Sequence, residues 1–282
     1  MKSCLLILVL AISALAVNTV SVSTPPVVSD DIEIAVVNDW TLSEKALEIA
    51  LMETPDGPRI LGIDNGDDVI RIWDNGQTSQ SITLPPASTG HSWGIACKND
   101  GDTVSEIIVN DFDKYDIYRS NDVGLTWDTF TDPGGKYSRG MDWDGTHYWT
   151  VINSYTDQLC RFQPGGTSEV WDIPEIGDTQ QGSGLAVFPM ADGNTGIALA
   201  AFDTNVFFFY SWDGSQLSYI GSALTPFSDS VMISLGLAYS PSTGHFFWTY
   251  GPAAGYRMVE FTVSLSPQSL STTTWGAIKT AF

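Results

Sequence analysis

The sequence predicts an all-β fold, a β-propeller of five four-stranded blades, from three observations. A short phrase centred on glycine recurs at intervals of roughly 44 to 52 residues, which is about the length of one propeller blade. Four strand-like segments follow one another within each interval. No long helical periodicity interrupts them. The four copies of the phrase are Ser92-Trp93-Gly94-Ile95-Ala96, Ser138-Arg139-Gly140-Met141-Asp142, Gly182-Ser183-Gly184-Leu185-Ala186 and Ser234-Leu235-Gly236-Leu237-Ala238.

Each repeat is predicted to place its four strands in the same order. The phrase opens the first strand, and an Asp-Gly or Thr-Gly pair then supplies the positive φ that a tight hairpin turn needs. Second strands are predicted at Glu106–Asn110, Tyr148–Asn153, Gly196–Phe202 and Phe246–Tyr250, third strands at Asp116–Arg119, Gln158–Phe162, Val206–Tyr210 and Tyr256–Val263, and fourth strands at Thr126–Phe130, Glu169–Ile173 and Leu217–Ile220.

One more blade is predicted before the repeats, without the glycine phrase. Two terminal segments, Ile32–Val37 and Thr272–Ile278, are then left over. One of them is expected to supply the outer strand of the last blade, because such closure removes an exposed sheet edge. The sequence leaves open which one does so, and a degenerate sixth blade is the alternative. The strands of the extra blade are predicted at Ala46–Met52, Arg59–Asp64, Asp68–Trp73 and Ser79–Leu84.

The N-terminus has the pattern of a secretory signal. Met1-Lys2 is followed by an apolar run from Cys4 to Val17, and Ala14-Leu15-Ala16 fits a small-residue cleavage site. Residues 1–16 are therefore predicted to be a signal peptide, residues 17–30 a flexible leader, and residues 31–282 a single propeller domain. No later stretch has the roughly 18 consecutive apolar residues of a membrane-spanning helix. We expect a secreted protein, periplasmic or extracellular, with no membrane span.

Charge and cysteine content narrow the classes of partner. The chain carries 12 basic and 33 acidic residues, for a net charge of −21. Such a field repels phosphate backbones, so we expect no nucleic-acid partner, and it favours a soluble monomer. Cys97 and Cys160 remain after signal cleavage and lie in apolar strand patterns. The sequence allows either one disulfide or two buried thiols.

The channel mouth is the predicted binding surface. The loops that join second to third strands and fourth to first strands share one face of a propeller, where the central channel opens, and such loops often carry function. Carboxylates, aromatic rings and one guanidinium there could bind a carbohydrate or a protein ligand without a cofactor. The leading hypothesis is a non-catalytic binding or scaffold module. Its predicted ligand-binding residues are Trp93, Asp111, Tyr137, Arg139, Gln181 and Asp203.

Paired carboxylates at the same face support an alternative function. A carbohydrate-active hydrolase or lyase would use Asp111 and Asp203 as acid and base, since glycoside cleavage needs two carboxyl groups about 5–10 Å apart. Oxygen atoms also cluster in the short loops Asp64–Asp68 and Asn99–Asp102, which could bind Ca²⁺, although neither fits a complete calcium-loop pattern. The three histidines lack the spacing of zinc ligands.

One segment carries a resemblance to known propellers. Gly140-Met141-Asp142-Trp143-Asp144-Gly145-Thr146-His147-Tyr148-Trp149-Thr150-Val151 resembles the blades of secreted bacterial propellers of the NHL-repeat group and of five-bladed glutaminyl cyclotransferases. The resemblance covers this blade well and its neighbours loosely, and it implies a ring of five blades. It implies no activity, because no cyclotransferase active-site motif can be placed on this sequence and such rings host many functions.

A second resemblance is local. Ser120-Asn121-Asp122-Val123-Gly124-Leu125-Thr126-Trp127 is similar, residue for residue, to the Asp-box of sialidases and of non-enzymatic propellers. The resemblance implies a hairpin between third and fourth strands in which Ser120 and Asp122 bond turn amides, Gly124 takes a positive φ and Trp127 packs inward. Sialidases also need an arginine cluster for their carboxylate substrate. This sequence lacks one, so sialidase activity is not expected.

Overall fold

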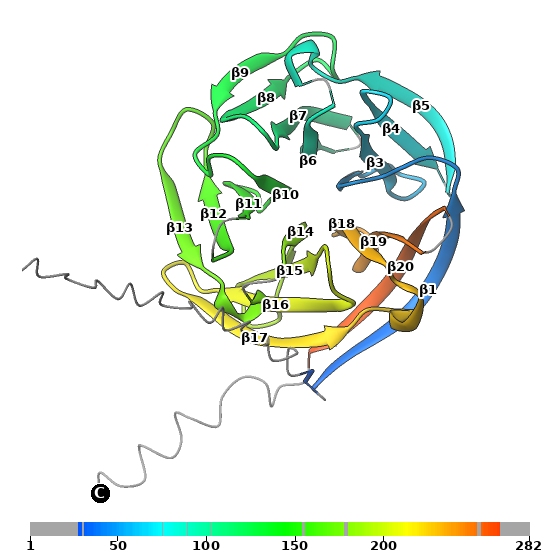
Figure 1. The fold of residues 1–282 in the computed structure, drawn as a ribbon, viewed down its shortest axis with the longest axis vertical. Helices are drawn as coiled ribbons and strands as arrows, with labels where there is room; N and C mark the ends of the chain where they lie inside the picture. The colour runs from blue at the N-terminus through cyan, green and yellow to red at the C-terminus, as the bar shows by residue number, and fades with distance from the viewer. Residues whose placement is uncertain are drawn as a thin grey trace, which may run out of the picture.

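The computed structural model describes residues 28–29, 31–74, 76–88, 90–101, 103–153, 156–177, 180–252 and 255–265. Within them, strands β1 to β20 form five antiparallel sheets of four strands each around a common centre (Figure 1). The predicted five-bladed β-propeller is confirmed, and the described chain does not form a sixth blade. The predicted signal peptide and the segment Thr272–Ile278 lie outside the described residues.

Each blade runs from an inner strand at the central channel to an outer strand at the rim (Figure 1). In order from inner to outer, blade one is β2 (Ile49–Met52), β3 (Arg59–Asp64), β4 (Val69–Asp74) and β5 (Gln77–Thr83), and blade two is β6 (Ser92–Asp100), β7 (Thr103–Asp111), β8 (Asp116–Ser120) and β9 (Asp128–Thr131). Blade three is β10 (Ser138–Trp143), β11 (Tyr148–Ile152), β12 (Gln158–Phe162) and β13 (Ser168–Asp172).

Blade four consists of β14 (Gly182–Pro189), β15 (Thr195–Ala201), β16 (Val206–Trp212) and β17 (Leu217–Leu224), and blade five of β18 (Ile233–Ser240), β19 (His245–Gly251), β20 (Tyr256–Leu265) and β1 (Ile32–Leu42). Short 3₁₀ turns lie in three loops that lead into the next blade, at η1 (Pro86–Ser88), η2 (Pro174–Ile176) and η3 (Ser228–Ser230). Neither these turns nor any other described segment has the length and apolar character of a membrane-crossing helix.

The N-terminal segment closes the ring. β1 pairs antiparallel with β20, from Ile32 opposite Leu265 to Leu42 opposite Tyr256. Blade five therefore joins the two ends of the folded chain, and the segment predicted at Ile32–Val37 supplies its outer strand. An ion pair crosses this junction, because Asp39 Oδ1 accepts a hydrogen bond of 2.9 Å from the Nε of Arg257.

Glycines in the repeated phrase let the inner strands touch. A methyl group at Gly94 would lie 2.0 Å from the carbonyl oxygen of Arg139 in the next blade, and one at Gly184 would lie 2.3 Å from a backbone oxygen of β18. Gly140 and Gly236 meet the next inner strand in the same way, at 2.6 Å. A side chain does not fit at such distances, so the repeated glycine reflects close backbone approach around the channel.

Apolar clusters fill the junctions between neighbouring blades. β16 shows why a strand inside a propeller is apolar on both faces, because Phe207 and Phe209 pack against blade five while Phe208 packs against blade three. Alternate residues of a strand point to opposite faces of its sheet, and in a ring both faces are covered. Cys97 and Cys160 are buried free thiols in separate clusters.

Side-chain hydrogen bonds hold the hairpin between β8 and β9. Ser120 Oγ donates to Asp122 Oδ1 at 2.8 Å and accepts a bond of 2.7 Å from the amide of Gly124, whose φ is 86°. The amide of Thr126 donates to Asp122 Oδ1 at 2.8 Å. Trp127 packs against the cluster between blades one and two. The hairpin lies at the rim and serves the fold.

Candidate functional site

The loops at one end of the channel bring four aromatic rings together. Trp93 opens β6, Phe112 follows β7, Tyr137 precedes β10 and Phe202 follows β15. Trp93 lies 5.5 Å from Phe112 and 5.8 Å from Phe202 between ring centroids, and Phe112 lies 5.3 Å from Tyr137. We call these four residues the mouth cluster. It joins blades two, three and four at the predicted binding face.

Backbone hydrogen bonds within and between blades hold the mouth cluster in place. The amide of Tyr137 donates to the carbonyl oxygen of Phe112 at 2.9 Å, and the amide of Phe202 donates to that of Gln181 at 2.6 Å. Tyr137 has a φ of 69°, a conformation that is rare for a bulky residue. Such strain often marks functional positions. The Tyr137 side chain is 46% exposed.

Arg139 lies beneath the mouth cluster rather than on the surface, with 6% exposure. The central carbon of its guanidinium is 4.2 Å from the ring centroid of Trp93, 4.9 Å from that of Phe112 and 5.2 Å from that of Phe202. Its Nη2 donates to Gln181 Oε1 at 2.7 Å. Its Nε and Nη1 are buried and have no hydrogen-bond partner among the described residues. The site therefore holds a cation inside an aromatic cage.

Burial of Arg139 has an electrostatic cost. It lowers the pKa of the guanidinium to about 10, and the nearby charges of Asp157 and Asp203 offset only part of that effect. The guanidinium stays protonated at neutral pH, because its pKa remains well above 7. A fixed positive charge thus lies directly under the exposed aromatic surface.

Polar groups surround the mouth cluster. The side chains of Gln181 and Asp203 are exposed to solvent, while Asn153, after β11, is buried and both polar atoms of its amide lack a hydrogen-bond partner within the described chain. Buried polar atoms are almost always satisfied in native proteins. The Asn153 amide thus offers a donor and an acceptor that no described group uses.

Asp111 is placed differently from the other predicted residues. Its side chain is fully buried, and its Oδ1 accepts hydrogen bonds from the amides of Asp113 (3.0 Å) and Lys114 (3.1 Å). Its Oδ2 lies 3.3 Å from Lys114 Nζ. These contacts hold the turn between β7 and β8. Of the residues predicted to bind ligand, the structure gathers Trp93, Tyr137, Arg139, Gln181 and Asp203 around the mouth cluster, and gives Asp111 this role in the turn.

The first loop considered for Ca²⁺ is occupied by protein groups. Asp64 Oδ1 accepts bonds from the amides of Gly66 (3.1 Å) and Asp67 (3.3 Å), and Asp64 Oδ2 lies 2.8 Å from the guanidinium of Arg71, which also pairs with Asp67. Both oxygens of Asp64 thus have protein partners. Over the described part of the chain, no cluster of three or more His, Cys, Asp or Glu could hold one.

The second loop considered for Ca²⁺ is only partly described. Asn99 donates to the carbonyl oxygen of Leu51 at 3.0 Å and accepts from the amide of Glu53 at 3.2 Å. Its side chain thus ties β6 to blade one. Asp102 lies outside the described residues.

Sequence reasoning missed Phe112 and Phe202. Both come one residue after the end of a second strand, in blades two and four, and Asn153 holds the same position in blade three. Alignment of the repeats by their second strands, instead of their glycines, would have shown these three positions to be equivalent. These positions lie at one face because the ring places equivalent loops around one channel.

Known proteins resemble this chain in fold. No protein-family model matches the chain, and no curated protein matches it in sequence. Glutaminyl cyclase from Myxococcus xanthus is similar with a TM-score of 0.59 and 12% identity, over 82% of this chain and 97% of that one. A chain of a nidogen/laminin complex has a TM-score of 0.50 and 10% identity, over 79% and 86%. Virginiamycin B lyase from Staphylococcus aureus has a TM-score of 0.45 and 12% identity, over 82% and 74%. The first two likenesses show a β-propeller fold, which hosts unrelated functions.

Proposed function

We propose that this protein is a secreted, monomeric binding propeller that holds a carbohydrate ligand at the mouth cluster without changing it chemically. The single observation that carries the proposal is the meeting of four aromatic residues from three blades, three of which surround a buried arginine. The arrangement needs no metal or cofactor. Secretion is inferred from the signal-like residues 1–16.

The chemistry of the surface favours a carbohydrate. A sugar ring offers an apolar face that stacks on aromatic side chains and a rim of hydroxyl groups that form hydrogen bonds. Tyr137 and Trp93 supply the aromatic surface, and Gln181, Asp203 and Asn153 supply exposed or unpaired polar atoms. A peptide could use the same surface, and a peptide ligand is one outcome of the test below.

Asp111 is poorly placed for the hydrolase or lyase alternative. Asp111 would be the general acid or base, yet its Oδ1 accepts two turn amides and its side chain is fully buried. A general acid must lie within hydrogen-bond reach of the substrate. Of the two carboxylates, only that of Asp203 is exposed. One carboxylate does not provide the pair that glycoside cleavage needs.

The test combines a glycan array with a panel of chromogenic glycosides. We expect saturable glycan binding that Trp93→Ala and Tyr137→Ala each weaken by about tenfold or more, as is typical of aromatic residues at the centre of a binding surface. Tyr219→Ala is the matched control, because Tyr219 is 39% exposed on the outer strand β17, away from the channel mouth. Glycoside turnover that Asp111→Asn abolishes would establish the enzyme instead, and binding to peptides alone would replace the ligand class.

A further inference from the structure

The opposite end of the channel holds a cavity of about 460 Å³. It is lined by residues of β2, β6, β10, β14 and β18 near their C-terminal ends, and by the hairpin turns that follow β10 and β14. These hairpins join first to second strands, so the cavity opens on the face away from the mouth cluster. Its volume lies within the range of roughly 300–1,000 Å³ that small-molecule sites occupy.

The lining combines negative charge with aromatic surface. Carboxylates come from Glu53, Asp142 and Asp144, and aromatic rings from Trp143, Phe188 and Tyr239. Of the described residues that line the cavity, none is Lys, Arg or His. A cavity of this composition attracts a positive charge and repels an anion.

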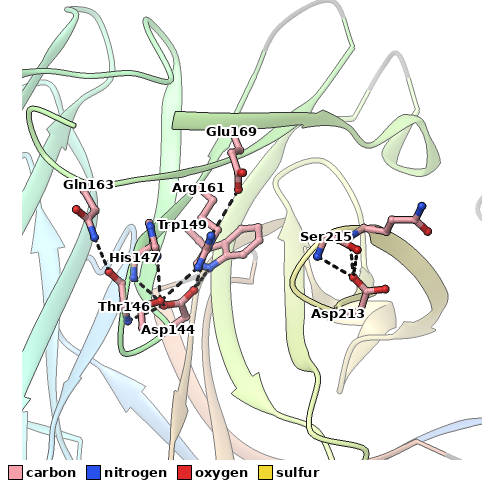
Figure 2. Close-up of polar contacts among 10 residues, drawn as sticks. Asp144, Thr146, His147, Trp149, Arg161, Gln163, Glu169, Asp213 and Ser215 are labelled. Carbon is pink, nitrogen blue, oxygen red and sulfur yellow. Dashed lines mark hydrogen bonds and ion pairs between the residues drawn. The ribbon is translucent and has the colours of Figure 1, made fainter. Parts of the chain in front are cut away.

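Asp144 is already neutralised by the protein. Figure 2 shows its carboxylate at the centre of a network in which Thr146, His147, Trp149 and Arg161 all donate to it. The Nε of Arg161 lies 3.3 Å from Asp144 Oδ2. Although burial opposes ionisation, these hydrogen bonds lower the pKa of Asp144. Asp144 therefore holds the turn between β10 and β11, and its negative charge is balanced by the positive charge of Arg161.

Asp142 and Glu53 have no such cation. Asp142 accepts hydrogen bonds from the amides of Trp143 (2.8 Å) and Val187 (2.7 Å), and each of its oxygens keeps a lone pair free. Glu53 accepts from the hydroxyls of Ser240 (2.8 Å) and Ser242 (2.5 Å). Neither carboxylate forms an ion pair among the described residues of the lining. The hydrogen-bond donors to Asp142 and Glu53 are thus all neutral groups.

We propose that this cavity binds a small organic cation, a protonated amine on an apolar body, with its ammonium group between Asp142 and Glu53 and its apolar part against Trp143, Phe188 and Tyr239. Charge-assisted hydrogen bonds from an ammonium group to carboxylates are stronger than neutral ones. Aromatic side chains add attraction for the same charge. Lys98 Nζ already lies 4.0 Å from the ring centroid of Trp143, so Phe188 and Tyr239 supply this attraction. All of these residues lie outside the mouth cluster, so amine binding here does not depend on the proposed function.

Binding is expected to strengthen with pH. Burial raises the pKa of Asp142 to about 7, and the charge of Asp144 adds to this, while the amides of Val187 and Trp143 oppose it. Other titratable groups around the channel and the cavity include Glu48, Glu53, Tyr239 and the Cys97 thiol, and burial raises the pKa values of Glu48, Cys97 and Tyr239. Lys98, which lies over Trp143, pairs with Glu106. Below about pH 7, Asp142 is therefore largely neutral. A rise in pH ionises it while an aliphatic amine remains protonated.

The experiment uses calorimetric titration of the whole protein with 2-phenylethylamine. Phenylacetate and 2-phenylethanol, which are anionic and neutral analogues of similar shape, are the reference compounds. We expect the amine to bind, the anion not to bind, and the alcohol to bind about tenfold more weakly than the amine, because the loss of one charge-assisted contact is worth about a factor of ten. Affinity for the amine should rise between pH 5.5 and pH 7.5.

Variants test whether the amine binds at Asp142 and Glu53. Asp142→Asn and Glu53→Gln should each weaken amine binding by about tenfold. If Asp142→Asn does not fold, Glu53→Gln alone tests whether the amine binds at this pair of carboxylates. Glu33→Gln is the matched control, since Glu33 is exposed on β1, the outer strand of blade five. Trp93→Ala should leave amine binding unchanged. Equal affinity for the amine and the alcohol, no amine binding at all, or unchanged amine binding in Glu53→Gln would each overturn the proposal.

Discussion

Glu48 and Asp142 accept hydrogen bonds from alternate amides on one edge of β14. Glu48 Oε1 lies 3.4 Å from the nitrogen of Leu185, and Asp142 Oδ2 lies 2.7 Å from that of Val187. β14 is an inner strand, so this edge faces the channel and has no further strand to pair with. Acidic side chains from blades one and three thus satisfy amides that a propeller leaves unpaired at its centre.

Replacement of Glu48 by glutamine should stabilise the protein at high pH. Glu48 is fully buried, and burial raises its pKa well above the ordinary value despite hydrogen bonds from Leu237 and Leu185. The folded state therefore holds a proton that the unfolded state loses, so the contribution of Glu48 to stability is greatest below its ordinary pKa of 4.5 and declines as pH rises. A glutamine side chain keeps a hydrogen-bond acceptor for the amides of Leu185 and Leu237 and does not titrate.

The difference in free energy of unfolding between Glu48→Gln and wild type should grow by about 1.4 kcal/mol per pH unit above pH 5 while Glu48 stays protonated. Urea unfolding at pH 5, 6 and 7 measures this difference. Glu169→Gln, at an exposed carboxylate, should show no such trend. A difference that stays constant with pH would mean that Glu48 is ionised in the folded protein.

Asp142 and Asp144 should titrate far apart although only one residue separates them. Burial raises the pKa of Asp142 to about 7, whereas hydrogen bonds from Thr146, Trp149 and His147 outweigh burial and lower that of Asp144. Carboxyl ¹³C chemical shifts followed from pH 3 to pH 9 measure both midpoints. Asp142→Asn assigns the signal by its disappearance. A midpoint for Asp142 below pH 5 would contradict the burial argument.

A methyl group at the centre of the ring should be strongly destabilising. In Gly184→Ala the added carbon would lie 2.3 Å from a backbone oxygen of β18, and backbone cannot rotate away as a side chain can. We expect a loss of about 3 kcal/mol in the free energy of unfolding, at the upper end for overpacked sites. Gly66→Ala is the control, because its nearest neighbour is a side-chain oxygen of Asp64 at 3.3 Å. Thermal unfolding that ranks the two variants equally would argue against the tight inner ring.

The ring was predictable because its constraints are local and repeated. Each inner strand needs a residue without a side chain where the next strand approaches, so Gly94, Gly140, Gly184 and Gly236 recur at blade length. The run from Val206 to Tyr210 is apolar throughout because blades cover both of its faces. Both features appear in the sequence as patterns of residue size and hydrophobicity.

The details of the site were harder to predict because they depend on contacts distant in the sequence. Glu48 bonds Leu185 and Leu237, which lie 137 and 189 residues away, and no local pattern marks it. An aspartate at the end of a strand has the same sequence context whether it caps a turn, as Asp111 does, or faces solvent, as Asp203 does. Only the arrangement of the blades in the ring distinguishes the buried aspartate from the exposed one.

Arg139→Met should fold at least as stably as wild type. Burial outweighs the nearby charges of Asp157 and Asp203 in lowering the pKa of Arg139 to about 10, so the buried charge is a net cost to the folded state. Methionine fills much of the same space among Trp93 and Phe202 without a charge, and apolar replacement of a buried ion is often neutral or stabilising.

Arg139→Ala provides the comparison for Arg139→Met, because it removes the charge and the volume together. A cavity left under the mouth cluster should cost about 2–4 kcal/mol, so its unfolding temperature should fall while that of Arg139→Met does not. Gln181 is exposed and can bond water in both variants, which leaves packing as the difference between them. If methionine destabilises the protein as much as alanine does, then the cation–π contacts of Arg139 contribute more to the fold than its burial costs.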